Sequence, residues 1–209
     1  MINKYFKYLP SFGSYRKTIK KQSEQTDFIL NTYIPVNIFK LDDLERVKKS
    51  SFNIVEIGCG NGETAINFAK LNPNCFYIAS DVYLDGLINT SKKIISQGLE
   101  NIKFWHADAR LLIENITNSL DYIFLFFPDP WPKNKHHKKR ILNAEFLELA
   151  KKALKPSGKI LTATDHPSYK DHIKKIASLQ TLFEVKQVDA PEWWIETNYQ
   201  SKALKAGRE

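Results

Sequence analysis

Short apolar runs alternate with amphipathic stretches from Asn53 onward. The apolar runs predict five strands, at residues 53–57, 75–80, 102–105, 122–127 and 159–164. Between these runs, apolar residues recur about every 3.6 positions, which predicts helices at 63–71, 84–97 and 140–154. Strands that alternate with helices in this way are typical of βαβ units. We therefore expect an α/β fold with a mostly parallel sheet and helices on both faces.

The two ends of the chain have less regular patterns. Residues 168–179 have helical spacing, and apolar runs at 183–188 and 197–204 predict two late strands. This final pair would add an antiparallel closing strand and bring the sheet to seven strands. Residues 1–50 form a basic leader and a helical segment broken by Pro35, so we divide the chain into 1–50 and 51–209. The leader is either a loosely attached tail or an arm that lies on phosphates.

Composition narrows the classes of protein. The 209 residues are 43% hydrophobic, which suits one globular domain. No apolar run reaches the ~18 residues of a membrane span, and the charged start lacks a signal-peptide core, so we expect a cytoplasmic protein. Cys59 and Cys75 are too few for a zinc knuckle or disulfide framework, and the adjacent His136 and His137 do not suit one metal ion. The net charge of +8 favours a polyanionic partner, nucleic acid or anionic lipid.

A glycine-rich loop follows the first predicted strand, at residues 55–64. Glycines at a strand-to-helix turn let the backbone approach a bound nucleotide, and Gly58 and Gly60 are the candidates here. Glu63 stands where a dinucleotide fingerprint needs its third glycine, and Glu56 precedes the loop. These carboxylates would repel a pyrophosphate but suit a cationic nucleotide. The loop therefore predicts S-adenosyl-L-methionine, which carries an ammonium and a sulfonium.

Two further acids follow the next two predicted strands. Asp81 is placed to accept from ribose hydroxyls, and Asp108 could accept from an adenine amino group. Each acid alone could equally be a helix N-cap or a solvated strand end. Ligands of open α/β sheets bind at the carboxyl ends of the strands, so three acids at three successive ends favour the cofactor interpretation.

The fourth predicted strand runs into Pro128-Asp129-Pro130-Trp131-Pro132-Lys133. The prolines stiffen this turn and would hold Asp129 and Trp131 at the mouth of the site. Trp131 could stack on a base, or it could simply pack into the core of a rigid turn. A basic run from Lys133 to Arg140 follows, where a phosphate backbone could lie.

The glycine loop, the turn at 126–133, the basic run and Thr164-Asp165 together resemble the bacterial tRNA (guanine-N7-)-methyltransferases over residues 51–200, with a weaker echo in the leader. The resemblance implies a Rossmann-like S-adenosylmethionine-dependent methyltransferase fold and tRNA as partner. It gives Glu56, Asp81 and Asp108 to the cofactor, Asp129 to the catalytic centre, and Lys133 and Asp165 to the substrate.

The family's late Thr-x-aromatic-Glu segment, which contacts the target nucleotide, corresponds here to Thr197, Asn198, Tyr199 and Gln200. Glutamine thus replaces the usual acid; it can bond a base edge but brings no negative charge. The implied reaction is direct methyl transfer to guanine N7, whose free lone pair needs no strong base. Holding N7 in line would supply most of the catalysis, and Asp129 would stabilise the positive charge that grows on the purine.

The sequence leaves two alternative functions open. Asp129-Pro130-Trp131 partly matches the Asp-Pro-Pro-aromatic motif of enzymes that methylate exocyclic amines, although the second proline is absent. The second alternative is a non-catalytic RNA-binding protein with the same fold. The intact set of predicted cofactor-binding acids argues against this alternative. The sequence leaves monomer and homodimer open.

Overall fold

The computed structural model describes residues 23–205 and 207. Its centre is a five-stranded sheet in the order β3-β2-β1-β4-β5, in which all neighbouring strands are parallel. The strands are β1 (Asn53–Ile57), β2 (Phe76–Ser80), β3 (Ile102–Trp105), β4 (Leu120–Phe126) and β5 (Leu154–Ala163). The prediction of a parallel α/β sheet is therefore confirmed. The sequence order reverses between β1 and β4, which is where open α/β sheets bind ligands.

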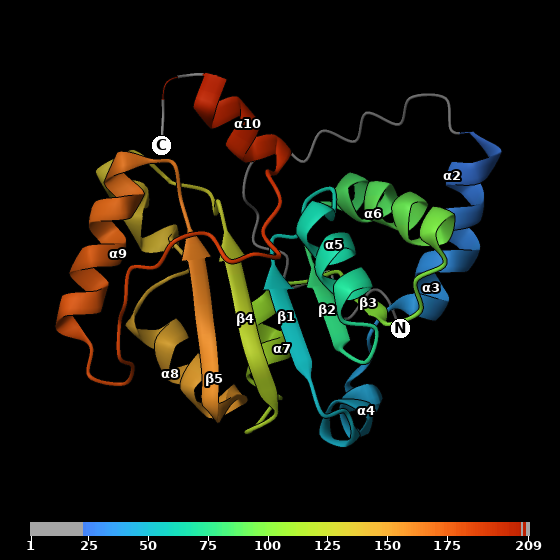
Figure 1. Cartoon of the computed structure of the whole chain (residues 1–209), viewed down its shortest axis with the longest axis horizontal. Coiled ribbons are helices and arrows are strands. Elements are labelled where there is room, and N and C mark those ends of the chain that lie inside the picture. Colours follow the sequence, from blue (N-terminus) through green and yellow to red (C-terminus); the bar gives the residue numbers. More distant parts are fainter. Residues whose placement is uncertain (1–22, 206, 208–209) are drawn as a thin grey trace.

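Helices connect the strands and cover both faces of the sheet (Figure 1). They are α5 (Glu63–Leu71), α6 (Leu84–Gln97), α7 (Ala109–Ile113), the 3₁₀ helix η4 (Asn134–Lys139), α8 (Ala144–Ala153), α9 (Pro167–Leu179) and α10 (Asn198–Lys205). Side-chain alternation in β1 assigns the faces. Ile54 packs in one core cluster with α5 and α6, whereas Val55 and Ile57 pack in the other with α7 and α8.

Helices also precede the sheet. They are α2 (Glu24–Phe28), the π-helix η2 (Ile29–Tyr33), α3 (Ile34–Asn37), the 3₁₀ helix η3 (Leu41–Asp43) and α4 (Leu44–Lys49). Ile29, Ile34, Phe39 and Val47 are buried in the two core clusters, and Ile38 forms a β-bridge with Phe104. The helical segment before residue 50 thus shares the core of the sheet domain. The boundary at residue 50 stays a prediction, and the basic leader of residues 1–22 lies outside the described residues.

The two late strands were predicted wrongly. Residues 183–188 are irregular: Val185 and Val188 are 55% and 66% exposed, and no strand among the described residues pairs with this run. Residues 198–205 form α10, because Thr197 caps a helix start: its Oγ1 accepts from Gln200 N at 3.2 Å and its carbonyl accepts from Ser201 N at 2.9 Å. The described part of the chain therefore has five strands instead of seven.

Candidate active site at the carboxyl edge of the sheet

The glycine loop and the proline-rich turn follow β1 and β4, so they meet at the point where the strand order reverses. Figure 1 shows α10 above this edge and α4 at the opposite end of the sheet. The loop is fastened to β2, since Gly58 N and Cys59 N both donate to the carbonyl of Ser80, at 2.8 and 3.0 Å. The predicted loop residues therefore lie at the carboxyl edge.

Asp81 is built into the same loop. Its Oδ2 accepts from Gly60 N and its Oδ1 accepts from Tyr83 N, both at 2.8 Å. These two bonds hold the carboxylate in one orientation beside the glycines. The carboxylate oxygens retain further acceptor capacity, because each has two lone pairs.

Gly62 has a structural role that its spacing did not reveal. It is the N-cap of α5 with φ of 70°, in the left-handed region that favours glycine. A Cβ built there would lie 2.4 Å from Cγ2 of Thr90 on α6. Any larger residue would push α6 away from the loop, so this glycine sets how closely the two elements approach.

Glu56 is the buried acid of the site, with 3% of its surface exposed. Its Oε2 accepts a 2.9 Å hydrogen bond from the hydroxyl of Tyr77. The pKa of the Glu56 carboxyl is raised to about 8. Burial is the main cause; the Tyr77 hydrogen bond lowers this pKa, and the negative charges of Asp81 and Glu63 add to the increase. A neighbouring cation would reverse this shift, so the site is suited to a positively charged ligand.

The same electrostatic coupling reaches the turn after β4. Burial raises the pKa of Asp81, and the charge of Asp129 contributes to that increase. Asp81 is therefore coupled electrostatically both to Glu56 and to Asp129. This set of carboxylates fits the ammonium, sulfonium and ribose hydroxyls of S-adenosylmethionine, as the loop sequence predicted.

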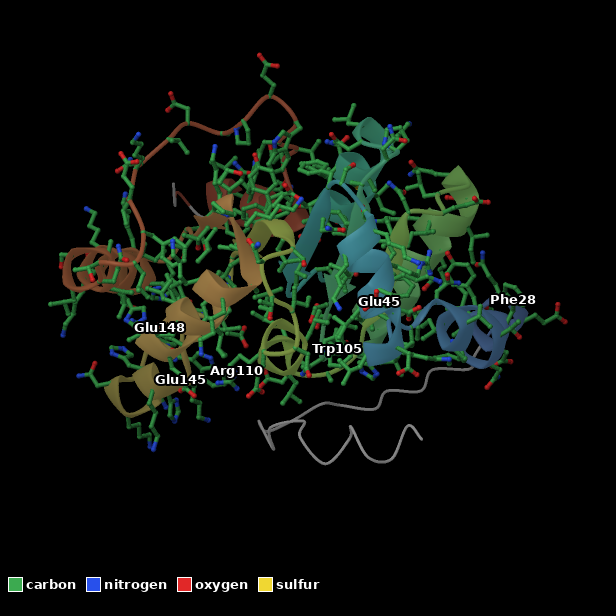
Figure 2. The ribbon with its side chains drawn as sticks, turned by 90° about the horizontal axis from the view of Figure 1, so that it is seen from below. Phe28, Glu45, Trp105, Arg110, Glu145 and Glu148 are labelled. Atoms are coloured by element: carbon green, nitrogen blue, oxygen red, sulfur yellow. The ribbon has the colours of Figure 1, made fainter. Side chains whose placement is uncertain are left out.

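Asp108 lies at the end of β3 but is engaged locally. Its Oδ1 caps α7 by accepting from Arg110 N at 2.9 Å, and the Arg110 guanidinium binds both carboxylate oxygens. Glu145 of α8 acts on the same guanidinium, and Figure 2 shows the two residues beside each other. The helix-cap alternative is therefore confirmed for Asp108, and its cofactor role stays a prediction.

The turn after β4 carries backbone strain at both of its ends. Phe127 and Trp131 are non-glycine residues with positive φ, 48° and 43°, and Asp129 is exposed between them. Arg140 anchors the turn through its guanidinium group. Its Nε donates a hydrogen bond to the carbonyl of Pro130 at 2.9 Å. Its other nitrogens donate to the carbonyl and hydroxyl of Ser168, at 3.0 and 2.9 Å.

Arg140 corrects the interpretation of the basic run. It is 2% exposed, so it fastens the turn to α9 and does not face a phosphate backbone. Lys133, Lys135 and Lys138 are exposed. Trp131 packs under this run, with Lys139 Nζ 4.6 Å from its ring centre. The stacking role of Trp131 stays a prediction.

The C-terminal segment closes one side of the site. Trp193 stacks on Phe124 with ring centres 5.2 Å apart, and its carbonyl accepts from Asn67 of α5 at 2.7 Å. The rings of Trp194 and Phe126 are packed edge to face, with their centres 4.8 Å apart. Both indoles thus pack on aromatic side chains of β4 and fasten the C-terminal segment to the sheet.

A cavity of about 250 Å³ lies between this segment and the ends of β4 and β5. Asp165 and Gln200, two predicted substrate residues, both line it, and Thr197 is buried at the start of α10. The positions 198 and 199 are helical, but their side chains are outside the described part of the structure. Tyr77, Trp193 and Trp194 were not predicted from the sequence. For the two tryptophans, the pair of indoles shortly after Pro191 was the available signal.

Two kinds of feature are absent from the described residues. No group of three or more histidine, cysteine, aspartate or glutamate side chains among them could hold a metal ion. None of the described helices has the length and apolar character of a membrane span. Cys59 and Cys75 are both buried free thiols.

The fold and the acid-lined glycine loop define a Rossmann-like methyltransferase that uses S-adenosyl-L-methionine. A family model described as "Putative methyltransferase" matches residues 50–209. The chain belongs to the tRNA (guanine-N(7)-)-methyltransferase family. It is 36% identical over 214 aligned residues to the enzyme of that name from Wolbachia pipientis wMel, covering 100% of this chain and 92% of the relative.

Other proteins that are similar to this chain are also named as methyltransferases. The tRNA (guanine-N(7)-)-methyltransferase of Granulibacter bethesdensis is 34% identical, with 74% of this chain and 73% of the relative aligned. A bifunctional methyltransferase of Rickettsia conorii is 36% identical over 86% of this chain, which matches only 35% of that longer protein. Among solved structures, an antibiotic-related methyltransferase has a TM-score of 0.50 and 25% identity over 62% of this chain and 66% of its own.

Proposed function

We propose that this protein methylates N7 of a guanine in the variable loop of tRNA, with S-adenosylmethionine as methyl donor. The observation that carries the proposal is the electrostatic coupling of Asp81 to both Glu56 and Asp129 at the strand-order reversal. It supports one shared site for the proposed cofactor acids and the proposed catalytic acid. The names of the relatives from Wolbachia and Granulibacter support the reaction and the substrate.

Residues of the glycine loop would hold the cofactor, which supplies an electrophilic sulfonium methyl group when bound. Glu56 would balance its positive charge, and Asp81, already oriented by Gly60 N, would accept from the ribose hydroxyls. Gly58 and Gly60 allow the close backbone approach. Asp108 has the weakest claim to the adenine amino group, because Arg110 already binds both of its oxygens.

The substrate side of the site needs no strong base, because N7 of neutral guanine carries a free lone pair. Catalysis would then come from positioning the base and from stabilising the positive charge that develops on the purine. Asp129 is the proposed charge-stabilising residue, held at the site by a turn that Arg140 fastens. Lys133 and Asp165, with the segment Thr197, Asn198, Tyr199 and Gln200, are proposed to bind the tRNA.

The exposed part of the basic run would lie on the tRNA backbone. Lys133, Lys135 and Lys138 extend from the turn that carries Asp129, so phosphates bound there would hold the target nucleotide near the cofactor loop. These contacts would position the RNA without reading its sequence. Recognition of the base would fall to the cavity beside Asp165 and Gln200.

The deciding experiment is methyl transfer from labelled S-adenosylmethionine to unmodified tRNA, followed by mapping of the modified nucleotide. We expect 7-methylguanosine in the variable loop. A methyl group on an exocyclic amine would instead support the alternative methyltransferase. Cofactor and tRNA binding without any transfer would support a non-catalytic RNA-binding protein.

A further inference from the structure

The cavity beside the active site has the walls of a base-binding pocket. Phe126, Phe127, Trp193 and Trp194 supply aromatic surface, and Thr162, Asp165 and Gln200 supply polar groups. Its volume of about 250 Å³ corresponds to roughly eight water molecules at ~30 Å³ each, enough for one heterocyclic base. The hydroxyl of Thr162 is buried without a hydrogen-bond partner among the described residues. A bound polar ligand would satisfy this hydroxyl.

One hydrogen bond fixes the polarity of this pocket. The indole Nε1 of Trp194 donates to Oε1 of Gln200 at 2.8 Å. An indole N–H can only donate, so it selects the carbonyl end of the glutamine amide and excludes the flipped orientation. The Nε2 amino group, a donor, therefore lies on the other side of the amide.

Asp165 provides the opposite character in the same cavity. Its carboxylate accepts hydrogen bonds, so the cavity combines an acceptor from the end of β5 with a donor from α10. The Watson–Crick edge of guanine presents an acceptor, O6, followed by two donors, the N1 proton and the 2-amino group. Adenine presents a donor followed by an acceptor and therefore mismatches this pair.

On the basis of the proposed function, we infer that Trp194 and Gln200 form a specificity pair that reads guanine O6. Trp194 orients the amide, Gln200 Nε2 donates to O6, and Asp165 accepts from the N1 proton and the 2-amino group. Holding the base by its Watson–Crick edge leaves the lone pair of N7, on the adjacent Hoogsteen edge, open to methylation. The glutamine thus takes part in recognition as a hydrogen-bond donor whose orientation Trp194 sets.

The test uses full-length protein and tRNAs ligated from synthetic halves, in which only the target guanosine is varied. One substrate carries 2-aminopurine, which lacks O6 and the N1 proton, and another carries inosine, which lacks only the 2-amino group. Values of kcat/KM are measured for wild type, Gln200→Met and Trp194→Phe. Comparing ratios between enzymes cancels differences in intrinsic base reactivity, as in a double-mutant cycle.

We expect Gln200→Met to reduce the preference for guanine over 2-aminopurine by about threefold to tenfold, the value of one neutral hydrogen bond. Trp194→Phe, which keeps the aromatic ring, should reduce it less, because the amide is then free to rotate. The preference for guanine over inosine should change with Asp165→Asn but not with Gln200→Met. The exposed Gln97→Met, at the end of α6, is the matched control and should change neither ratio.

The outcomes separate this inference from the proposed function. Wild-type transfer to guanine N7 with an unchanged guanine preference in Gln200→Met would overturn the inference alone. If wild type transfers no methyl group to the guanosine tRNA, the proposed function fails and the inference with it. Circular dichroism melts of each variant identify folding defects. If Gln200→Met does not fold, Trp194→Phe is the deciding variant. A reduced preference for guanine over 2-aminopurine would support the inference, and an unchanged preference would overturn it.

Discussion

Replacing Glu56 with glutamine should stabilise the ligand-free protein. Burial raises the pKa of the carboxyl from 4.5 to about 8 in the folded protein. Unfolding therefore releases a proton between these two pH values, and stability falls as pH rises through that range. At pH 7 the solution lies about 2.5 units above the unfolded pKa, and at about 1.36 kcal/mol per unit the wild-type protein loses roughly 3 kcal/mol of folding free energy.

Glutamine at position 56 keeps the shape of the protonated acid and can accept the Tyr77 hydrogen bond, but it does not titrate. The variant should melt about 5–10 °C above wild type at pH 7 and close to wild type at pH 4. Thermal unfolding of the ligand-free protein at the two pH values measures this. Glu45→Gln is the control, because Glu45 is an exposed residue of α4 (Figure 2) whose pKa is lowered by Lys48. Its substitution should give no gain that appears between pH 4 and 7.

The same substitution should weaken S-adenosylmethionine binding tenfold or more at pH 8, where wild-type Glu56 becomes ionised beside the cationic ligand. Wild-type affinity should rise with pH between 6 and 8, and that dependence should be lost in Glu56→Gln; calorimetry measures both. An equal stability gain at pH 4 and pH 7 would refute the titration argument. Unchanged cofactor affinity would refute the role of Glu56 in the site.

Three further predictions concern the turn and the basic run. Arg140→Met should lower kcat more than tenfold while the dissociation constant for S-adenosylmethionine changes less than twofold, because the turn loses its anchor; an equal loss of both would contradict a positioning role. Asp129→Ala should slow single-turnover transfer at least tenfold with cofactor binding retained, and a near wild-type rate would rule out charge stabilisation. Replacing Lys133, Lys135 and Lys138 together with alanine should make tRNA binding less dependent on salt. The slope of log affinity against log salt concentration should decrease in magnitude by about 2 units. Lys48→Ala, at the opposite end of the sheet, should leave that slope unchanged.

The sheet and the cofactor loop could be predicted because their signals are local. All five residues of β1 are buried, so the strand is a continuous run in the sequence, and the loop directly follows it. Asp81 was found by its place after the second strand, and the structure joins it to Gly60 N. Short-range patterns of this kind can be read from the sequence because they determine the helices and strands directly.

The remaining features depend on contacts between distant residues. Residues 183–188 alternate like a strand, but none of the described strands pairs with them, and the sequence of the segment alone does not reveal this. Arg140 was grouped with its charged neighbours, whereas its contacts are to Ser168, 28 positions away. The Trp194 bond to Gln200 depends on a helix that begins at Thr197, where the pattern had predicted a strand.

The central position of β1 has a consequence for synthesis on the ribosome. One edge of β1 pairs with β2, which follows within residues 76–80, but the other edge pairs with β4, at residues 120–126. Asn53 reinforces this second seam, since its side chain donates to the carbonyl of Ser119 at 2.9 Å and its backbone N–H to Asp121 at 2.8 Å. Until β4 has left the exit tunnel, β1, all of whose residues are buried in the folded protein, has an unpaired edge. The interval in which residues 58–119 are made is therefore when this protein is most exposed to misassociation, and when a chaperone would bind it.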